Sequence, residues 1–246
     1  MLFSTLRPTR SLTAKSLVMA LAVLMTACGG ASSDSSVSAA AQSDETSQNQ
    51  AETGSTGAAS VGDDMVLGAA DAPVTVIEYA SVTCPGCASF HATTFPALKE
   101  KYIDSGQVKL IFREFPTPPV DFSYIGSVLA RCAGEKNGAE AYFVVIDALL
   151  KNQRTWIYGD DPKLELLKIA GQAGMDEPAF DACLARQDII DAMNERIEEG
   201  RTKFNIQSTP SFVVDGEPTR FGNQDAFFAI LDEKLGIQPD SEADGE

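Results

Sequence analysis

Two cysteines flank a proline and a glycine in the stretch YASVTCPGCASFH, residues 79 to 91. Cys84 and Cys87 follow PVTVIEYA, a β-branched run of strand length. A helix is expected next, with Pro85 at its first position. Its pattern continues through CASFHATTFPALKEKYIDSG, residues 87 to 106, and Gly106 closes it. A thiol at a helix N-terminus faces unpaired backbone N–H groups and the positive end of the helix dipole, which stabilise the thiolate. The spacing therefore predicts a reactive dithiol that forms and breaks a disulfide.

Two other uses of the same cysteines are open. A zinc site needs four ligands, and the chain has one histidine and no second pair of cysteines at this spacing. A purely structural disulfide usually closes a longer loop, where its effect on chain entropy is larger. We therefore expect redox chemistry without a metal and without a cofactor.

The beginning of the chain predicts export. Three basic residues precede the apolar run SLVMALAVLM, which is too short to span a bilayer. The run ends in MTACGG, which resembles the lipobox of bacterial lipoproteins, whose signal is cut before a cysteine that is then lipidated. Residues 1–27 are thus expected to be a lipoprotein signal peptide, with lipid on Cys28; an ordinary signal peptide with a chance cysteine is the alternative. By analogy with such lipoproteins, Gly29 favours a periplasm-facing protein anchored in the outer membrane.

Composition separates a linker from a globular part. Residues 28–63 are rich in Ser, Ala, Gly, Gln and acids and lack aromatic and basic residues, which predicts a disordered tether. The remaining chain is long enough for one domain with an insertion, and residues 237–246 form an acidic tail. Lys and Arg number 19 against 35 Asp and Glu, a net charge of −16, so no nucleic-acid partner is expected.

The periodicity of the globular part predicts the order strand, helix, strand, several helices, hairpin, helix. Pro96 should kink the first helix. The second strand is VKLIFREFP, residues 108 to 116, and only helical patterns follow over residues 121 to about 204. A hairpin is expected in STPSFVVDGEPTRFG around an Asp215-Gly216 turn, before a last helix in QDAFFAILDEKLG. This order implies a mixed sheet with helices on its faces.

These features together resemble the DsbA-like thiol:disulfide oxidoreductases of the thioredoxin superfamily. The resemblance is carried by EYASVTCPGCASFH, the strand ending in REFP, the helical block and QSTPSFVVDG, and covers roughly residues 65 to 235. It implies an α/β, thioredoxin-like fold with an inserted helical domain. Residues 64–117 and 204–236 would form the thioredoxin-like domain and residues 118–203 the insertion.

The resemblance also assigns roles outside the dithiol. The family carries a cis-proline opposite the cysteines, where an extended substrate segment pairs with exposed backbone, and Thr209-Pro210 match it. The alternative is that Pro210 only begins a strand. An acid six residues before the first cysteine lies beneath the family's active site and aids proton transfer at the second one. Glu78 has that spacing, although on a half-exposed strand its side chain would face solvent instead.

His91 and the residues between the cysteines bear on the thiolate. His91 shares a helix face with Cys87, and it either packs in the core or tunes the field at Cys84. In the best-known family members a histidine between the cysteines stabilises the thiolate. Here Pro85 and Gly86 hold those places, which argues against a very strongly oxidising potential.

Two further cysteines fall in the helical block. With Cys28 lipidated and Cys84 paired to Cys87, Cys132 and Cys183 remain as an even pair in an oxidising compartment. This favours a structural bridge between them, with free buried cysteines as the alternative.

The activity implied by the resemblance is disulfide donation to unfolded or cysteine-containing exported proteins, with a membrane redox partner that restores the disulfide. A disulfide reductase or isomerase would use the same residues, but family isomerases usually add a dimerisation domain, whose pattern is not visible in this sequence. A lipoprotein that only binds peptides with this fold is a third hypothesis.

Overall fold

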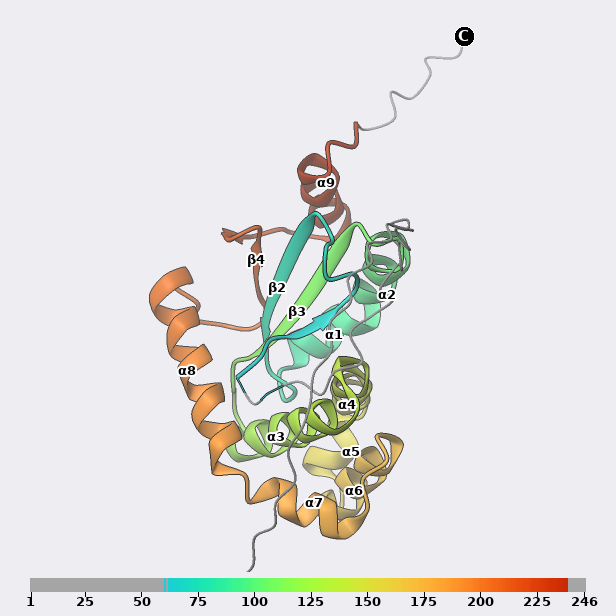
Figure 1. Ribbon diagram of the computed structural model, residues 1–246, viewed down its shortest axis with the longest axis vertical. Helices are drawn as coiled ribbons and strands as arrows, with labels where there is room; N and C mark the ends of the chain where they lie inside the picture. The colour runs from blue at the N-terminus through green and yellow to red at the C-terminus, as the bar shows by residue number, and fades with distance from the viewer. Residues whose placement is uncertain (1–59, 61, 239–246) are drawn as a thin grey trace, which may run out of the picture. The chain divides into compact units, whose positions relative to one another are not determined.

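The computed structural model describes residue 60 and residues 62–238 (Figure 1). The signal sequence, Cys28, most of the tether and the end of the acidic tail lie outside the described residues. The strands of the described part are β1 Met65–Leu67, β2 Val74–Ala80, β3 Val108–Glu114, β4 Ser211–Val214 and β5 Glu217–Thr219. Its α-helices are α1 Pro85–Thr93, α2 Phe95–Leu98, α3 Val120–Asn137, α4 Ala139–Lys151, α5 Gln153–Tyr158, α6 Pro162–Gln172, α7 Glu177–Leu184, α8 Gln187–Phe204 and α9 Gln224–Lys234.

The strands form one mixed sheet in the order β1-β3-β2-β4-β5. β2 and β3 are parallel, whereas β1, β4 and β5 each pair antiparallel with their neighbours. Parallel pairing brings the carboxyl ends of β2 and β3 to the same edge, with Ala80 opposite Glu114. The first cysteine and the inserted helices therefore both leave the sheet at this edge.

The two faces of the sheet are covered by different helices. Because side chains alternate along a strand, Val76, Glu78 and Ala80 share one face of β2 while Tyr79 points to the other. Tyr79 packs with residues of α8, and an added Cβ at Gly200 would lie 2.5 Å from its ring. A glycine at that position therefore lets α8 approach the sheet closely.

The expected first helix is divided. α1 ends at Thr93, α2 begins at Phe95, and a π-helical turn follows over Lys99–Ile103. Pro96 lacks the N–H that would bond to the preceding turn, so the sequence correctly indicated a disturbance here but understated it. Gly106, with φ of +75°, follows the last turn, as expected for a glycine that closes a helix.

The block between β3 and β4 contains α3 to α8. In Figure 1, α3 to α7 gather below the lower end of β2 and β3, α8 rises along one side, and α9 lies toward the opposite end. Apolar side chains of these helices, such as Leu129, Ile146 and Ile189, join Val76 and Leu110 of the sheet in one core. No helix of the described part has both the length and the apolar character needed to cross a membrane.

A buried charged network lies where β3 ends. Glu114 accepts hydrogen bonds from Arg131 Nη2 at 2.8 Å and from the Tyr142 hydroxyl at 2.7 Å, and Arg196 Nη2 lies 3.8 Å from its carboxylate. Burial alone would raise the pKa of Glu114, but the charges of Arg131 and Arg196 and the hydrogen bonds from Arg131 and Tyr142 together outweigh it, and the pKa is lowered. Arg131 also donates to the Asp63 carbonyl at 2.7 Å. The network thus holds α3, α4 and the segment before β1 to the end of β3.

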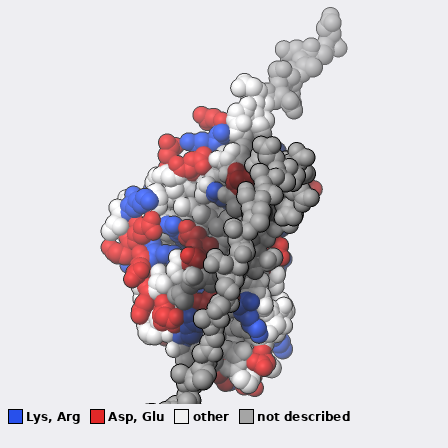
Figure 2. Space-filling model, viewed as in Figure 1, with Lys and Arg blue, Asp and Glu red and all other residues white. Residues whose placement is uncertain are grey.

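Charges on the surface follow a different pattern. Acidic and basic side chains are interspersed on the face seen in Figure 2. Exposed pairs include Lys151 with Asp147 at 2.7 Å and Lys234 with Glu217 at 3.0 Å. Such pairs contribute little to stability, because their charges stay in contact with solvent.

Candidate active site

Cys84 lies where β2 has ended and α1 begins. Its backbone is extended, with φ of −80° and ψ of 121°, and its side chain is the N-cap of α1. The backbone N–H of Cys87 donates to Cys84 Sγ across 3.4 Å. Pro85 occupies the first turn, where its missing N–H would have had no partner within the helix. Both cysteines are free thiols in this structure.

The two thiols have opposite environments. Cys84 is 9% exposed and Cys87 is completely buried. Hydrogen bonds from the Cys87 side chain, from Thr209 and from backbone N–H groups of α1 outweigh burial and lower the pKa of Cys84 to about 5. Burial, the hydrogen bond to Cys84 and the charge of Glu78, in that order, raise the pKa of Cys87. At neutral pH the arrangement therefore gives a thiolate at Cys84 and a protonated thiol at Cys87.

The loop before β4 contacts Cys84. The Thr209–Pro210 peptide bond is cis, and the Thr209 carbonyl oxygen lies 3.5 Å from Cys84 Sγ. An added Cβ at Gly86 would lie 3.3 Å from Pro210 Cδ, so the glycine leaves just enough room for the proline ring. The sulfur thus lies beside backbone groups that precede a strand.

Glu78 and His91 form a buried pair. Glu78 is completely buried on β2, and His91 on α1 is 4% exposed. Glu78 Oε2 lies 2.9 Å from His91 Nε2, while Glu78 Oε1 has no hydrogen-bond partner among the described residues. The alternative in which Glu78 faces solvent is therefore wrong. The partner that the structure gives His91 is Glu78 rather than the Cys84 thiolate.

Known proteins resemble this chain over most of its length. A model described as thioredoxin matches residues 60–233, well over half of the chain. The chain belongs to the thioredoxin family. A Bacillus cereus protein named probable disulfide bond formation protein D is 33% identical to this thioredoxin-family chain. The match covers 61% of this chain and 69% of the Bacillus cereus protein.

Other relatives are longer. A Rickettsia bellii protein, provisionally named a protein-disulfide oxidoreductase, is 36% identical over 175 residues, which are 70% of this thioredoxin-family chain and 64% of that protein. Rickettsia typhi and Rickettsia felis proteins match over 62% and 61% of their lengths. The chain therefore spans less than two thirds of these Rickettsia relatives.

Solved structures show the same fold. The crystal structure of Wolbachia pipientis alpha-DsbA1 is 30% identical, with a TM-score of 0.62 over 71% of this chain and 92% of that one. The structure of BdbD from Bacillus subtilis has a TM-score of 0.60 over 74% of this chain and 97% of that one at 22% identity, a likeness in fold alone. The resemblance to DsbA-like proteins and the thioredoxin-like fold with a helical insertion are thus confirmed.

Several polar residues that support the site were not predicted from the sequence. Ser81 and Thr83, just before the first cysteine, hydrogen-bond to each other at 2.9 Å, and Ser81 bonds to Ser123 of α3 at 2.8 Å. Gln153 of α5 donates to the carbonyls of Val82 and Cys84 at 2.9 and 3.0 Å. The small polar residues before the dithiol were a visible signal, but nothing in the sequence indicated Gln153. In this thioredoxin-family chain, these bonds hold the segment between β2 and the dithiol against the inserted helices α3 and α5.

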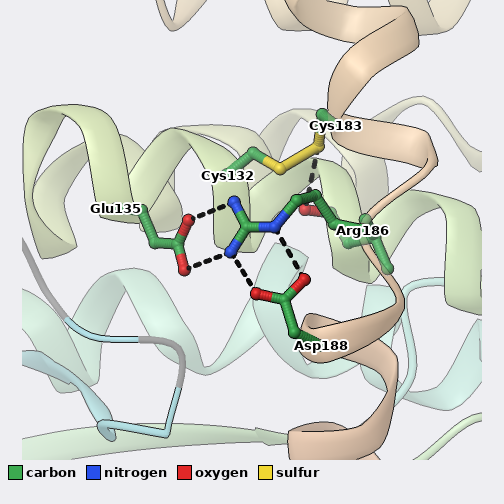
Figure 3. The surroundings of a disulfide bond; sticks show 6 residues. Cys132, Glu135, Cys183, Arg186 and Asp188 are labelled. Carbon is green, nitrogen blue, oxygen red and sulfur yellow. Dashed lines mark hydrogen bonds and ion pairs between the residues drawn. A yellow bond between two sulfur atoms is a disulfide. The ribbon is translucent and has the colours of Figure 1, made fainter. Parts of the chain in front are cut away.

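The remaining predicted cysteines lie away from the dithiol. Cys132 of α3 and Cys183 of α7 form a disulfide with Cα atoms 6.1 Å apart (Figure 3). Beside it, Arg186 pairs with Glu135 of α3 at 2.8 Å and with Asp188 of α8 at 2.6 Å. This junction thus has a covalent bridge and an ion-pair cluster side by side. Within residues 60 and 62–238 no three His, Cys, Asp or Glu side chains are grouped so as to hold a metal ion.

Proposed function

We propose that this chain is a thiol:disulfide oxidoreductase of the cell envelope that donates disulfides to exported proteins. The observation that carries the proposal is the asymmetry of the dithiol, with the pKa of Cys84 at about 5 and that of buried Cys87 raised. A thiolate of low pKa is a good leaving group, which favours reduced enzyme and oxidised client.

The reaction proceeds in two exchanges. A client thiolate attacks Cys84 Sγ of the enzyme disulfide, forming a mixed disulfide and releasing Cys87, which takes up a proton. A second client thiolate then attacks the client sulfur of the mixed disulfide and expels Cys84 as a thiolate. Two electrons pass from the client to the enzyme, and the client gains one disulfide. Glu78, buried with an unpartnered Oε1 within the described residues, would supply the proton to Cys87.

The cis-proline loop provides the place for the client chain. The Thr209 carbonyl beside Cys84 precedes β4, so an extended client segment would pair with backbone at Thr209 while its thiol reaches the sulfur. Unfolded or cysteine-containing segments fit this surface because they can adopt an extended conformation. Gly86 keeps the surface free of a side chain.

Location and reoxidation are proposed from the sequence. Export follows from the signal-like beginning of the chain, and lipidation at Cys28 would anchor the domain to a membrane, with the outer membrane favoured by Gly29. A membrane-bound redox partner would then reoxidise the dithiol. An envelope reductase or isomerase, and a peptide-binding lipoprotein without catalysis, are the alternative functions.

A redox titration tests the proposal. The full chain is equilibrated with glutathione buffers of defined ratio, and the fraction of Cys84 open to alkylation is measured by mass spectrometry. A potential near about −120 mV supports donation, whereas one near about −270 mV indicates a reductase or isomerase. Wild-type chain that never exchanges while still binding a reduced, unfolded client would favour the binding module. Cys84→Ser is the control, because it removes the attacked sulfur and leaves the peptide surface.

A further inference from the structure

When Cys87 is released as a thiolate inside the protein, it has to take up a proton. If the proposed function is correct, Cys87 leaves Cys84 as a thiolate in every donation and must lose its proton again in every reoxidation. Its side chain is completely buried, and burial is the largest cause of its raised pKa. Water therefore has poor access, and a protein group has to exchange this proton.

Glu78 can interact with both the sulfur of Cys87 and the imidazole of His91. It bonds to His91, which lies one helical turn from Cys87 on the same face of α1, and its negative charge is among the causes that raise the pKa of Cys87. The carboxylate oxygens are unequal, because Oε2 bonds to His91 Nε2 at 2.9 Å and Oε1 has no partner in the described part of the chain. A buried carboxylate oxygen without a partner is costly, and one that receives a proton during the reaction explains why it is left open.

His91 is held in one orientation by aromatic rings. Phe95 stacks on the imidazole with ring centroids 4.6 Å apart, and Phe90 and Phe112 contact it edge-on at 5.6 and 6.1 Å. Across the sheet, Phe112 and Phe212 are the strand neighbours of Glu78. The pair thus lies among apolar rings, where a hydrogen bond between two titratable groups is strong.

His91 is also the outer member of the pair. It is 4% exposed, whereas Glu78 and Cys87 are completely buried. Among these three groups, the imidazole alone has any exposure through which a proton can reach solvent. A phenylalanine or leucine would fill the same space without this capacity.

We propose that His91 is a positioning residue that forms, with Glu78, a two-membered proton relay serving Cys87. When a client displaces Cys87, the Glu78 carboxylate takes the Nε2 proton of His91 while His91 Nδ1 takes up a proton from solvent. The Glu78 carboxyl then passes a proton to Cys87 Sγ and is a carboxylate again. In reoxidation each transfer runs backwards, so Cys87 becomes a thiolate and attacks Cys84 Sγ. The relay carries protons only, and the two electrons pass between sulfurs.

The relay is tested by separating the two steps of oxidation by glutathione disulfide. In the first step Cys84 attacks and forms a mixed disulfide with glutathione, and in the second Cys87 loses its proton and releases glutathione. Acid quenching followed by mass spectrometry of the full chain resolves the reduced, mixed and oxidised forms, and so gives both rates.

Two substitutions of His91 distinguish holding from proton exchange. His91→Phe removes the bond to Glu78 and keeps an aromatic ring, whereas His91→Gln can still donate to Glu78 but cannot exchange a proton. We expect the second rate to fall about a hundredfold in both variants and the first rate to stay unchanged, in line with the usual effect of general acid–base catalysis. Phe228→Leu, which removes a ring that packs on Tyr102 and has no ring contact with His91, is the control and should keep both rates.

Coupling to Glu78 gives an independent readout. Glu78→Gln should slow the second step by the same factor, and the double variant with His91→Gln should be no slower, because both residues act on one path. A wild-type second rate in His91→Gln would overturn the relay and leave His91 only holding Glu78. Equal losses in both rates would also overturn it. If the wild-type chain shows neither step, the proposed function fails, which is a different result from normal exchange in the His91 variants.

Discussion

The backbone N–H of Cys87 points at Cys84 Sγ across 3.4 Å, so the nucleophilic sulfur is itself the cap of helix α1. A capping atom that carries negative charge satisfies an N–H at the positive end of the helix. The same contact also places the second cysteine one turn inside the helix, where it is completely buried. The hydrogen bond from the Cys87 side chain is the largest cause of the low pKa of Cys84, and this N–H contact adds to it while the same geometry buries Cys87.

The stability of the reduced protein should depend on pH through Cys84. Its pKa is about 5 when folded and about 8.5 for an ordinary thiol, so the unfolded state binds more protons between these values. The free energy of unfolding of the reduced form should therefore rise, relative to the oxidised form, from about pH 5 to about pH 8.5. The raised pKa of Cys87 acts only above this window. Urea unfolding of both forms at a series of pH values measures the difference, and a flat difference would contradict the thiolate assignment.

Gly86→His should make the dithiol more oxidising. An imidazolium next to Cys84 would lower its pKa further, and each unit of pKa corresponds to about 1.4 kcal/mol, or about 30 mV in the potential of the couple. Glutathione titration measures the shift. Gly86→Ala is the control, because its Cβ alone would lie 3.3 Å from Pro210 Cδ. An equal shift in the alanine variant would show that crowding, and not charge, is responsible.

Removing the bridge between α3 and α7 should affect stability and not exchange. The cysteines are 51 residues apart, and a loop of this length gives a chain-entropy contribution of about 4 kcal/mol. The double variant Cys132→Ser/Cys183→Ser should lose about this much free energy of unfolding while keeping the exchange rate of Cys84. Arg186→Gln, in the adjacent ion-pair cluster, should cost less than about 1 kcal/mol because its side chain is partly exposed. Equal losses in the two variants would argue against a dominant role of the bridge.

Glu114→Gln should be strongly destabilising. The substitution keeps the size of the side chain but leaves the buried guanidinium of Arg131 without its charged partner, which typically costs about 3 to 5 kcal/mol. Asp147→Asn, in an exposed pair with Lys151, is the matched control and should cost less than about 1 kcal/mol. Thermal or urea unfolding measures both losses. A small effect of Glu114→Gln would mean that the network does not specify the end of β3.

Features set by neighbours in the chain could be predicted from the sequence. The strand before the dithiol, the helix that begins at Pro85 and the hairpin around Asp215 and Gly216 depend on local preferences. The turn residues have φ of 47° and 82°, values that Asp and Gly tolerate. The break at Thr94 was only partly predictable, because Pro96 marks a disturbance and the packing around it decides how the helix resumes.

By itself, the sequence determined the element order from β2 onward and the position of a reactive dithiol at a strand-to-helix junction, because periodicity and spacing act over a few residues. It did not indicate the three-residue edge strand β1, which is set by its pairing with β3. Only the tertiary structure decided which side chains share the interior. Glu78 and His91 are 13 residues apart on different elements, and Glu114 meets Arg131 and Tyr142 on two inserted helices. Such pairs form because a buried charge must find a partner among whatever groups the fold brings near, and that proximity is set by the packing of the whole domain.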